Sequence, residues 1–339
     1  MRMAMVTMAA EPEKSFAAEI LDEARNEEEE EYNAMVAEMA KTARSPEAIA
    51  KLKQTAEAAV AALKERPEVS AALEKKAKPT GKLAKALKKM SKSLALVGEG
   101  VDLGEVTTMG GYDLQDPEYL SEEFRTGGGS AMCVSVDLET SLAAGSLSKT
   151  IQEQSKAKGD FPGPIPVFAR APIIDELQLA AAALEGAVGA IVPACLNSKE
   201  KIGELLAAGE AMGLEMMVRV CDAEELSTAM DLEAKILVFG DIPLVDATAL
   251  LKDLPQGKAG PVTVCDLPYF DVRGAWQCRD AGFNALISGK SFLDVCVRDR
   301  VPPAAICKAI LSKGSVKYGL GMQKGRLEGS KEFLGSLAM

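Results

Sequence analysis

Histidine is absent from all 339 residues of the chain. Its absence excludes Ser-His and Cys-His nucleophile pairs and imidazole metal sites, and leaves Asp, Glu, Lys and Cys for proton transfer. The seven cysteines include no Cys-x-x-Cys pair, which a zinc site built from cysteine alone would need. Cys133, Cys195, Cys221 and Cys265 fall in or just after apolar runs, so we expect buried, reduced thiols in a reducing intracellular compartment. We predict no metal site and no cofactor.

Long hydrophobic runs are also absent. No stretch of eighteen apolar residues occurs, so we expect no transmembrane segment. The opening MRMAMVTMAA is rich in Met and Ala but lacks the apolar core of a secretory signal; the remnant of an organelle-targeting peptide is the alternative. Basic side chains are fewer than acidic ones, 39 against 50, so the formal net charge is −11. This balance disfavours nonspecific binding to nucleic acid or to an anionic membrane.

Short apolar runs that alternate with amphipathic helical patterns dominate the rest of the chain. The clearest unit spans residues 166–226, where apolar runs at 166–168, 190–192 and 216–220 are each separated by one helix. Asp175 can cap the first of these helices, which ends near Gly186, and Asn197-Ser198 can cap the second, which ends near Gly213. Such βα units form either a doubly wound parallel sheet or a closed (β/α)8 barrel.

The pattern repeats often enough to favour the barrel over an open sheet. We predict eight strands, near residues 94–98, 131–136, 166–169, 190–193, 215–220, 235–239, 261–265 and 284–288. Eight helices are predicted near residues 116–126, 146–157, 175–185, 198–212, 222–230, 244–252, 270–281 and 302–313. We therefore divide the chain into a helical extension at 1–92, a (β/α)8 TIM barrel at 93–313 and a flexible tail at 314–339.

Charge is segregated along the helical extension. Residues 11–39 carry eleven acidic and two basic side chains, whereas residues 75–92 carry eight lysines and no acid. Leu83, Leu87, Met90 and Leu94 form one helical stripe, with lysines opposite. Two interpretations remain open: a solvated charged face over a core-packing stripe, or an arm whose acidic and basic blocks recognise a partner or each other.

Candidate functional residues stand where the predicted strands end, because barrel chemistry lies at that face. Arg170, Arg219 and Asp266 each occupy such a position. Gly289-Lys290-Ser291 follows the eighth strand and opens a short apolar helix, whose first backbone N–H groups favour a phosphate. Alternatively, Gly289 simply turns the chain. We predict that Gly289, Lys290, Ser291, Arg170, Arg219 and Asp266 are the remnant of an anion pocket. The alternative is that the arginines pair with Asp137, Asp241 and Asp266 as structural salt bridges.

Several stretches of the chain resemble indole-3-glycerol phosphate synthases. PVFARAPIID at 166–175 is similar to the family's PVLRKDFIID, and the segment from 183 to 226 is similar to the strand-helix-strand that follows. Residues 270–293, FDVRGAWQCRDAGFNALISGKSFL, resemble the family's last helix and strand, and residues 112–137 the segment leading into its second strand. The resemblance implies a TIM barrel of the ribulose-phosphate-binding type. It also implies closure of an indole ring, with loss of water and carbon dioxide, on carboxyphenylamino-deoxyribulose phosphate.

The same alignment replaces the family's reactive groups. The lysine general acid falls on Arg170, which can pin an anion but cannot readily give up a proton. The glutamate of the fifth strand falls on Arg219, and the asparagine of the sixth falls on Gly240. After the seventh strand the family's ESG motif becomes Asp-Leu-Pro, in which Pro268 has no backbone N–H to offer phosphate.

The predicted first strand also lacks the reactive residues of the family. The family's glutamate and lysine fall on Val97 and Glu99, and its substrate-gripping serines fall on Asp102 and Gly104. Since Gly289 and Ser291 alone retain the family's phosphate cradle, we predict a non-catalytic, synthase-like barrel that serves as a scaffold or protein-binding subunit.

The expected partner is a protein bound by the N-terminal helices and the C-terminal tail. The alternatives are a protein that binds a phosphorylated small molecule, with Asp266 or Glu99 as proton carrier, and a divergent lyase of the tryptophan pathway. Ancestry and the Met-Ala-rich opening favour a plastid stroma, with the cytoplasm as the other soluble compartment.

Overall fold

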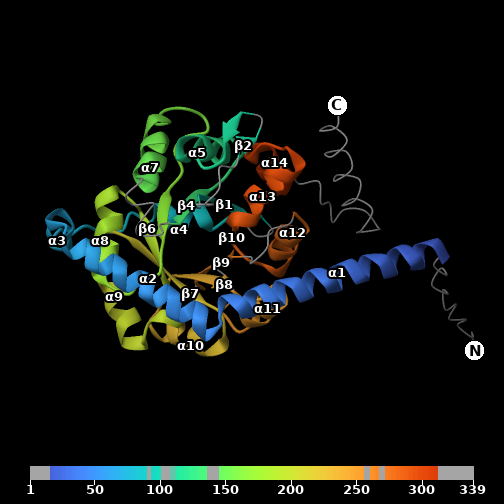
Figure 1. Cartoon of the computed structure of the whole chain (residues 1–339), viewed down its shortest axis with the longest axis horizontal. Helices are drawn as coiled ribbons and strands as arrows, with labels where there is room; N and C mark the ends of the chain where they lie inside the picture. Colours follow the sequence, from blue (N-terminus) through green and yellow to red (C-terminus); the bar gives the residue numbers. More distant parts are fainter. Residues whose placement is uncertain are drawn as a thin grey trace, which may run out of the picture.

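Eight parallel strands close into a barrel in the computed structural model of the chain (Figure 1). The structure describes residues 16–89, 93–100, 108–109, 111–135, 145–255, 260–266 and 272–311, without the side chains of residues 16–29, 108, 109, 273 and 290. In order around the barrel the strands are β1 (Ala95–Gly100), β4 (Ala131–Ser135), β5 (Val167–Arg170), β6 (Gly189–Pro193), β7 (Glu215–Val220), β8 (Ile236–Gly240), β9 (Val262–Asp266) and β10 (Ala285–Ile287). The predicted (β/α)8 barrel is confirmed.

Helices cover the outside of the barrel and precede it. Those preceding it are α1 (Phe16–Ala43), α2 (Pro46–Lys64), α3 (Pro67–Leu73) and α4 (Lys82–Leu87). Those between and after the strands are α5 (Pro117–Thr126), α7 (Ser146–Lys156), α8 (Glu176–Glu185), η1 (Ala194–Leu196), α9 (Lys199–Ala211), α10 (Ala223–Asp231), α11 (Leu244–Lys252), α12 (Val272–Ala281), α13 (Gly289–Asp299) and α14 (Pro303–Leu311). A short hairpin, β2 (Thr108–Met109) with β3 (Tyr112–Asp113), lies beside the barrel; neither it nor the one-turn η1 was predicted.

The strands are buried on both faces, which explains their continuous apolar runs. In β7, Met216, Val218 and Val220 belong to the core between barrel and helices, while Met217 belongs to the barrel interior. Since side chains alternate along a strand, Arg219 lies on the same inward side as Met217, one layer nearer the carboxyl end. The barrel therefore changes from apolar to charged along its axis.

Local capping signals fix where several helices begin. The Asp175 carboxylate accepts a hydrogen bond from the Leu177 N–H, and Gln178 completes a capping box for α8. Ser198 caps α9, and Ser45 caps α2 just before a proline in its first turn. The predicted caps at Asp175 and Ser198 are confirmed.

The segment before β1 seals the N-terminal end of the barrel. Leu83 and Leu87 of α4 are fully buried in the barrel-interior cluster. The Glu215 carboxylate, at the start of β7, accepts hydrogen bonds from the N–H groups of Leu83 (2.9 Å) and Ala84 (2.8 Å). A carboxylate at a helix N-terminus satisfies backbone donors that no residue within the helix can reach.

The predicted stripe from Leu83 to Leu94 is wrong as a single helix. Helix α4 ends at Leu87, and the backbone of Lys88 is no longer helical (φ −82°, ψ 88°). Leu94 packs in the outer core cluster, directly before β1, rather than with Leu83 and Leu87. Met90 lies outside the described residues, as do residues 312–339 and hence the predicted tail. No described helix is long and apolar enough to cross a membrane.

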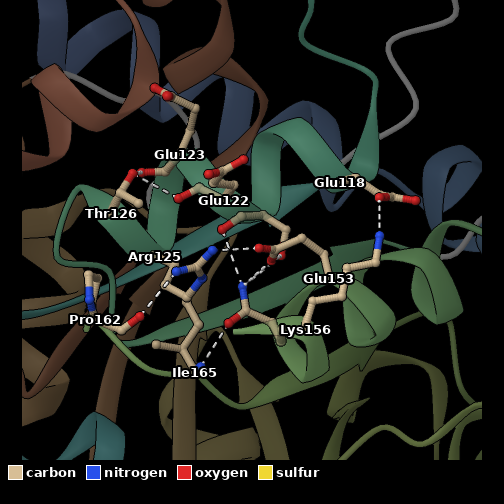
Figure 2. A network of polar contacts seen from close by, with 11 residues as sticks. Glu118, Glu122, Glu123, Arg125, Thr126, Glu153, Lys156, Pro162 and Ile165 are labelled. Atoms are coloured by element: carbon tan, nitrogen blue, oxygen red, sulfur yellow. Dashed lines mark hydrogen bonds and ion pairs between the residues drawn. The ribbon is translucent and has the colours of Figure 1, made fainter. Parts of the chain in front are cut away.

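Two ion pairs of different burial join α5 to α7 (Figure 2). Arg125 donates to Glu153 at 2.7 Å, and both side chains are only 9% exposed. The second Glu153 oxygen accepts from Ser121 (2.6 Å) and Gln154 (2.8 Å), while Arg125 also donates to the Pro162 carbonyl (3.1 Å). On the same two helices, Lys156 meets Glu118 at 2.6 Å with side chains 66% and 45% exposed. The buried pair sits within a hydrogen-bonded network, and the outer pair stands in solvent.

Candidate functional site

Five charged side chains converge at the carboxyl end of the barrel. They are Glu99 from β1, Arg170 from β5, Arg219 from β7, Asp266 from β9, and Asp241 just after β8. Asp266 is the centre, with its carboxylate 3.0 Å from Arg170 Nη2 and 2.9 Å from Arg219 Nη2. We call these five residues the mouth network. It joins the predicted Arg170, Arg219 and Asp266 directly.

Each arginine of the mouth network faces a second carboxylate as well. Arg170 Nη1 lies 3.0 Å from Glu99 Oε1, and Arg219 Nη2 lies 2.8 Å from Asp241 Oδ1. A second contact, between Arg219 Nη1 and Asp241 Oδ2, makes that pair bidentate. Three carboxylates thus surround two guanidinium groups, so the formal charge of the network is −1. Both arginines are neutralised within the protein.

The surrounding hydroxyl groups hold Glu99 in place. Ser135, at the end of β4, donates a hydrogen bond to Glu99 Oε1 at 2.6 Å. The Glu99 N–H donates to Ser288 Oγ at 3.2 Å, and the Ser288 N–H donates to the Val97 carbonyl at 3.0 Å. Glu99 is only 3% exposed, so its charge depends on these partners and on Arg170.

Gly240 and Arg219 fit one another. A Cβ built at Gly240 would overlap the Arg219 guanidinium, so any larger residue there would displace this side chain. The next residue, Asp241, adopts a left-handed backbone (φ 55°), which aspartate tolerates better than most residues do. A glycine at position 240 therefore makes room for the Arg219 guanidinium.

Replacing Gly240 with alanine should lower the free energy of unfolding by about 1–3 kcal/mol, because Arg219 must move away from Asp241 or Asp266. Chemical denaturation of the two proteins measures the difference. Gly203→Ala is the matched control: this residue lies inside α9, and its nearest atom would be Leu232 Cδ2 at 3.4 Å. It should leave stability unchanged or raise it by up to about 1 kcal/mol. Equal losses in both variants would contradict the proposed fit.

The ion pairs of the mouth network stabilise the charged forms of Arg170 and Asp266. Burial alone would lower the pKa of Arg170, but Asp266 and Glu99 hold it well above its ordinary value. Burial alone would raise the pKa of Asp266, but Arg170 and Arg219 hold it below 3.8. A protonated arginine and an ionised aspartate therefore face each other at neutral pH, and neither is poised to exchange a proton.

Acid should remove the contribution of Asp266 to stability. Its pKa is lower in the folded than in the unfolded protein, so that contribution is complete above the unfolded value of 3.8 and is lost as pH falls through the folded value. The difference in unfolding free energy between the wild type and Asp266→Asn should be constant above about pH 5 and shrink below pH 3.8. Urea titrations at a series of pH values measure it. A difference independent of pH down to 3 would contradict the assignment.

Helix α2 covers the mouth network and leaves a cavity of about 500 Å³ beneath it. Ile49, Leu52 and Thr55 of α2 line one side, and Arg170 and Arg219 line the other. The remaining wall includes Arg44, Lys51, Ser135, Ile191, Cys195 and Leu196. A small molecule could occupy this space between an apolar helix face and the ion pairs.

The predicted phosphate-binding turn lies at the start of α13. Gly289 has a left-handed backbone (φ 65°), as expected for a residue that turns the chain, and Ser291 is 7% exposed. The helix begins directly after Ser288, which itself contacts the first strand. The Lys290 side chain lies outside the described part of the chain, so its predicted approach to Arg170 and Arg219 stays a prediction.

Val97 and Glu99, the two positions of the first strand named above, lie at different depths in the barrel. Val97 is fully buried in the barrel interior, one layer below the mouth, whereas Glu99 reaches the mouth network. Asp102, Gly104 and Pro268 lie outside the described residues.

One polar cluster beside the mouth was not predicted. Arg44, at the junction of α1 and α2, lies 2.8 Å from Asp222 and 3.5 Å from Glu225. The Cys221 thiol donates to Glu225 at 2.8 Å, and burial and this neighbour raise the pKa of Cys221. The ligand atoms of Cys221, Asp222 and Glu225 lie within 4.8 Å of one another, close enough for a metal ion. Because Arg44 already pairs with both carboxylates, the arrangement fits a clasp between α1 and the barrel better than a metal site.

Comparison with known proteins identifies the family. A sequence model of the indole-3-glycerol phosphate synthase family matches residues 49–241. An indole-3-glycerol phosphate synthase of Streptomyces griseus is 27% identical over 214 residues, which cover 61% of this chain and 75% of that protein. Another, from Roseiflexus sp., is 24% identical over 184 residues, covering 52% and 68%.

Solved structures are similar to this chain at low sequence identity. A 2-keto-3-deoxy-6-phospho-gluconate aldolase of Zymomonas mobilis covers 68% of this chain and 96% of its own, with 12% identity and a TM-score of 0.46. Since the family model spans more than half of the chain, this protein belongs to the indole-3-glycerol phosphate synthase family.

Proposed function

We propose that this chain is a non-catalytic member of its family, used as a scaffold or protein-binding subunit of a larger assembly. The observation that carries the proposal is the mouth network. Where a synthase would need groups that exchange protons with its substrate, this chain has two arginines bound to three carboxylates. Those ion pairs satisfy one another and leave no proton-transfer role for Arg170 or Asp266.

Burial adds an energetic argument. Arg170 and Arg219 have side chains 24% and 17% exposed, and Asp266 is 5% exposed. Removing one partner from such a set leaves an uncompensated buried charge. A substrate that took either arginine away from Asp266 would have to supply a replacement charge, so the network resists ring-closure chemistry.

The segments outside the barrel support the subunit role. Helix α1 is 28 residues long, and the described side chains that it buries are Val36 and Ala40. Met35 and Met39 of the same helix are 41% and 40% exposed. Most side chains of its described part, residues 30–43, are exposed, which suits this helix to contact a second protein.

A second candidate function is binding of a phosphorylated small molecule, which the cavity beneath α2 favours. Its lining combines Arg170, Arg219 and Lys51 with apolar side chains. The predicted turn at Gly289 and Ser291 would hold the phosphate through backbone N–H groups. Isothermal titration calorimetry with inorganic phosphate, on the wild type and on Arg219→Gln as control, tests this candidate. Equal heats of binding from both proteins would exclude the mouth network as the phosphate-binding site.

Assay of ring closure tests the main proposal. The purified chain, supplied with carboxyphenylamino-deoxyribulose phosphate, should give no indole fluorescence, while the Streptomyces griseus relative under the same conditions serves as positive control. A loss of the general acid alone costs on the order of 10²–10⁴ in rate, so a single substituted group would leave measurable turnover. Turnover at a rate near the control's would overturn the proposal.

A place in the plastid stroma stays part of the proposal, and fractionation of the source cells tests it.

A further inference from the structure

One end of the barrel carries a dense cluster of exposed lysines. We define the lysine surface as the exposed residues Lys75, Lys76, Lys78, Lys82, Lys85, Lys88 and Lys89. Its platform is rigid, because Leu83 and Leu87 of α4 are fully buried and Glu215 binds the first N–H groups of the helix. Glu74 is the one acidic residue between positions 74 and 89. In a chain of net charge −11, this surface is a strong local exception.

The opposite charge is concentrated on α1. We define the acidic segment as residues 27–31, five consecutive glutamates inside this helix. Five acidic residues in a row concentrate negative charge within about one and a half turns of helix. Glu27 and Glu31 are also separated by four positions, a spacing at which like charges destabilise a helix. A cationic partner would relieve this repulsion.

The acidic segment cannot reach the lysine surface of its own chain. Helix α1 is held at the carboxyl end of β7, where Arg44 meets Asp222, and the lysine surface is held at the other end of β7, where Glu215 binds α4. Figure 1 shows α1 continuing from its attachment point outward, beyond the barrel. A continuous helix cannot fold back on itself, so the two charged regions stay apart within one molecule.

We propose that the acidic segment of one copy binds the lysine surface of a second copy, and that the chain thereby assembles head to tail. The proposal deepens the scaffold function and rests on it. Two different surfaces meet at such a contact, so the interaction is heterologous, and repetition gives a ring if the rotation closes and a filament if it does not. Charge complementarity sets the partner and orientation, and salt weakens the contact because the seven lysines, Glu30 and Glu31 are exposed.

Sedimentation velocity of the full chain tests the assembly. At about 50 mM salt the wild type should form concentration-dependent oligomers, and at about 0.5 M salt it should be a monomer, since the Debye length falls from roughly 14 Å to about 4 Å. A monomer at about 100 μM protein in low salt would overturn the proposal. So would oligomers that are unaffected by salt.

A charge swap identifies the two surfaces. One variant carries Lys75→Glu, Lys76→Glu and Lys78→Glu; the other carries Glu27→Lys, Glu28→Lys and Glu30→Lys. The first variant leaves four lysines against three glutamates on the lysine surface, and the second leaves two glutamates against three lysines in the acidic segment. Each variant alone therefore lacks one of the two charged partners and should stay a monomer in low salt. Mixed in equal amounts, the two should assemble into a one-to-one dimer, because the intact acidic segment of the first variant meets the intact lysine surface of the second. Failure of the mixture to assemble would overturn the assignment of these surfaces.

Matched controls separate this contact from net charge and from folding. A third variant, which reverses three exposed lysines elsewhere, should assemble as the wild type does: Lys53→Glu, Lys149→Glu and Lys158→Glu. Circular dichroism verifies that each variant is folded. If a polyglutamate peptide bound the lysine surface while the wild type stayed monomeric, a different acidic partner would replace the second copy.

The two proposals fail in different ways. Ring closure by an assembled protein would overturn the non-catalytic function and leave head-to-tail assembly standing. A monomeric protein without turnover would overturn the assembly and leave the non-catalytic barrel.

Discussion

Replacing Arg125 with alanine should lower the free energy of unfolding by about 3–5 kcal/mol, because it leaves the Glu153 charge buried without its cation. Ser121 and Gln154 would still donate to the carboxylate, but neither carries a charge. The guanidinium also binds the Pro162 carbonyl, and that acceptor would lose its partner too (Figure 2). Urea denaturation followed by circular dichroism measures the loss.

The control lies on the same two helices. Lys156→Ala removes an ion pair of similar length, 2.6 Å, whose side chains stand in solvent, and stability should hardly change. High salt should reduce the small contribution of the Lys156–Glu118 pair to the free energy of unfolding. The loss of stability caused by Arg125→Ala should be nearly the same in high salt, because that pair is buried. Comparable losses from the two substitutions would show that burial does not set the strength of these pairs.

Replacing Arg219 with glutamate, the residue that the resemblance places in the fifth strand, should damage the fold. Arg219→Glu would place a fourth carboxylate beside Asp241, Asp266 and Glu99, with Arg170 as the remaining cation of the network. We expect a loss of more than about 5 kcal/mol, since buried like charges repel in addition to losing their partner. Thermal and chemical denaturation measure it.

Arg219→Gln is the matched control, because it removes the charge without reversing it. The expected loss is about 3–5 kcal/mol, smaller than that of the glutamate variant. Adding Asp266→Asn to Arg219→Glu should recover part of the stability, because one of the crowded carboxylates disappears. A glutamate variant as stable as the wild type would mean that the mouth network does not hold the barrel together.

Periodicity and capping residues were sufficient to predict the barrel. All eight strands begin and end within about two residues of their predicted limits, because buried parallel strands are short apolar runs bounded by strong helix signals. The helix predicted through Leu94 failed for a local reason. The apolar spacing of Leu83 and Leu87 continues to Leu94, but that leucine packs in the outer core directly before β1.

The candidate site was harder to predict than the fold. The rule that barrel chemistry lies at strand ends located Arg170, Arg219 and Asp266, yet it could not show that they bind one another. That pairing depends on the inward direction of each side chain and on the space left by Gly240. The clasp of Arg44 with Asp222 and Glu225 joins residues 178 and 181 positions apart, and no local pattern signals it.

The seal at the N-terminal end of the barrel has a consequence for how the chain folds during synthesis. Helix α4 is made before any strand, but the carboxylate that binds its first turn, Glu215, comes 132 residues later than Leu83. At about 5–20 residues per second, a ribosome needs roughly 7–26 s to add that length. Through that interval Leu83 and Leu87 have no barrel to enter. The first helices of the chain therefore reach their final positions only after β7 has left the ribosome, and the long wait makes this segment a natural client of chaperones.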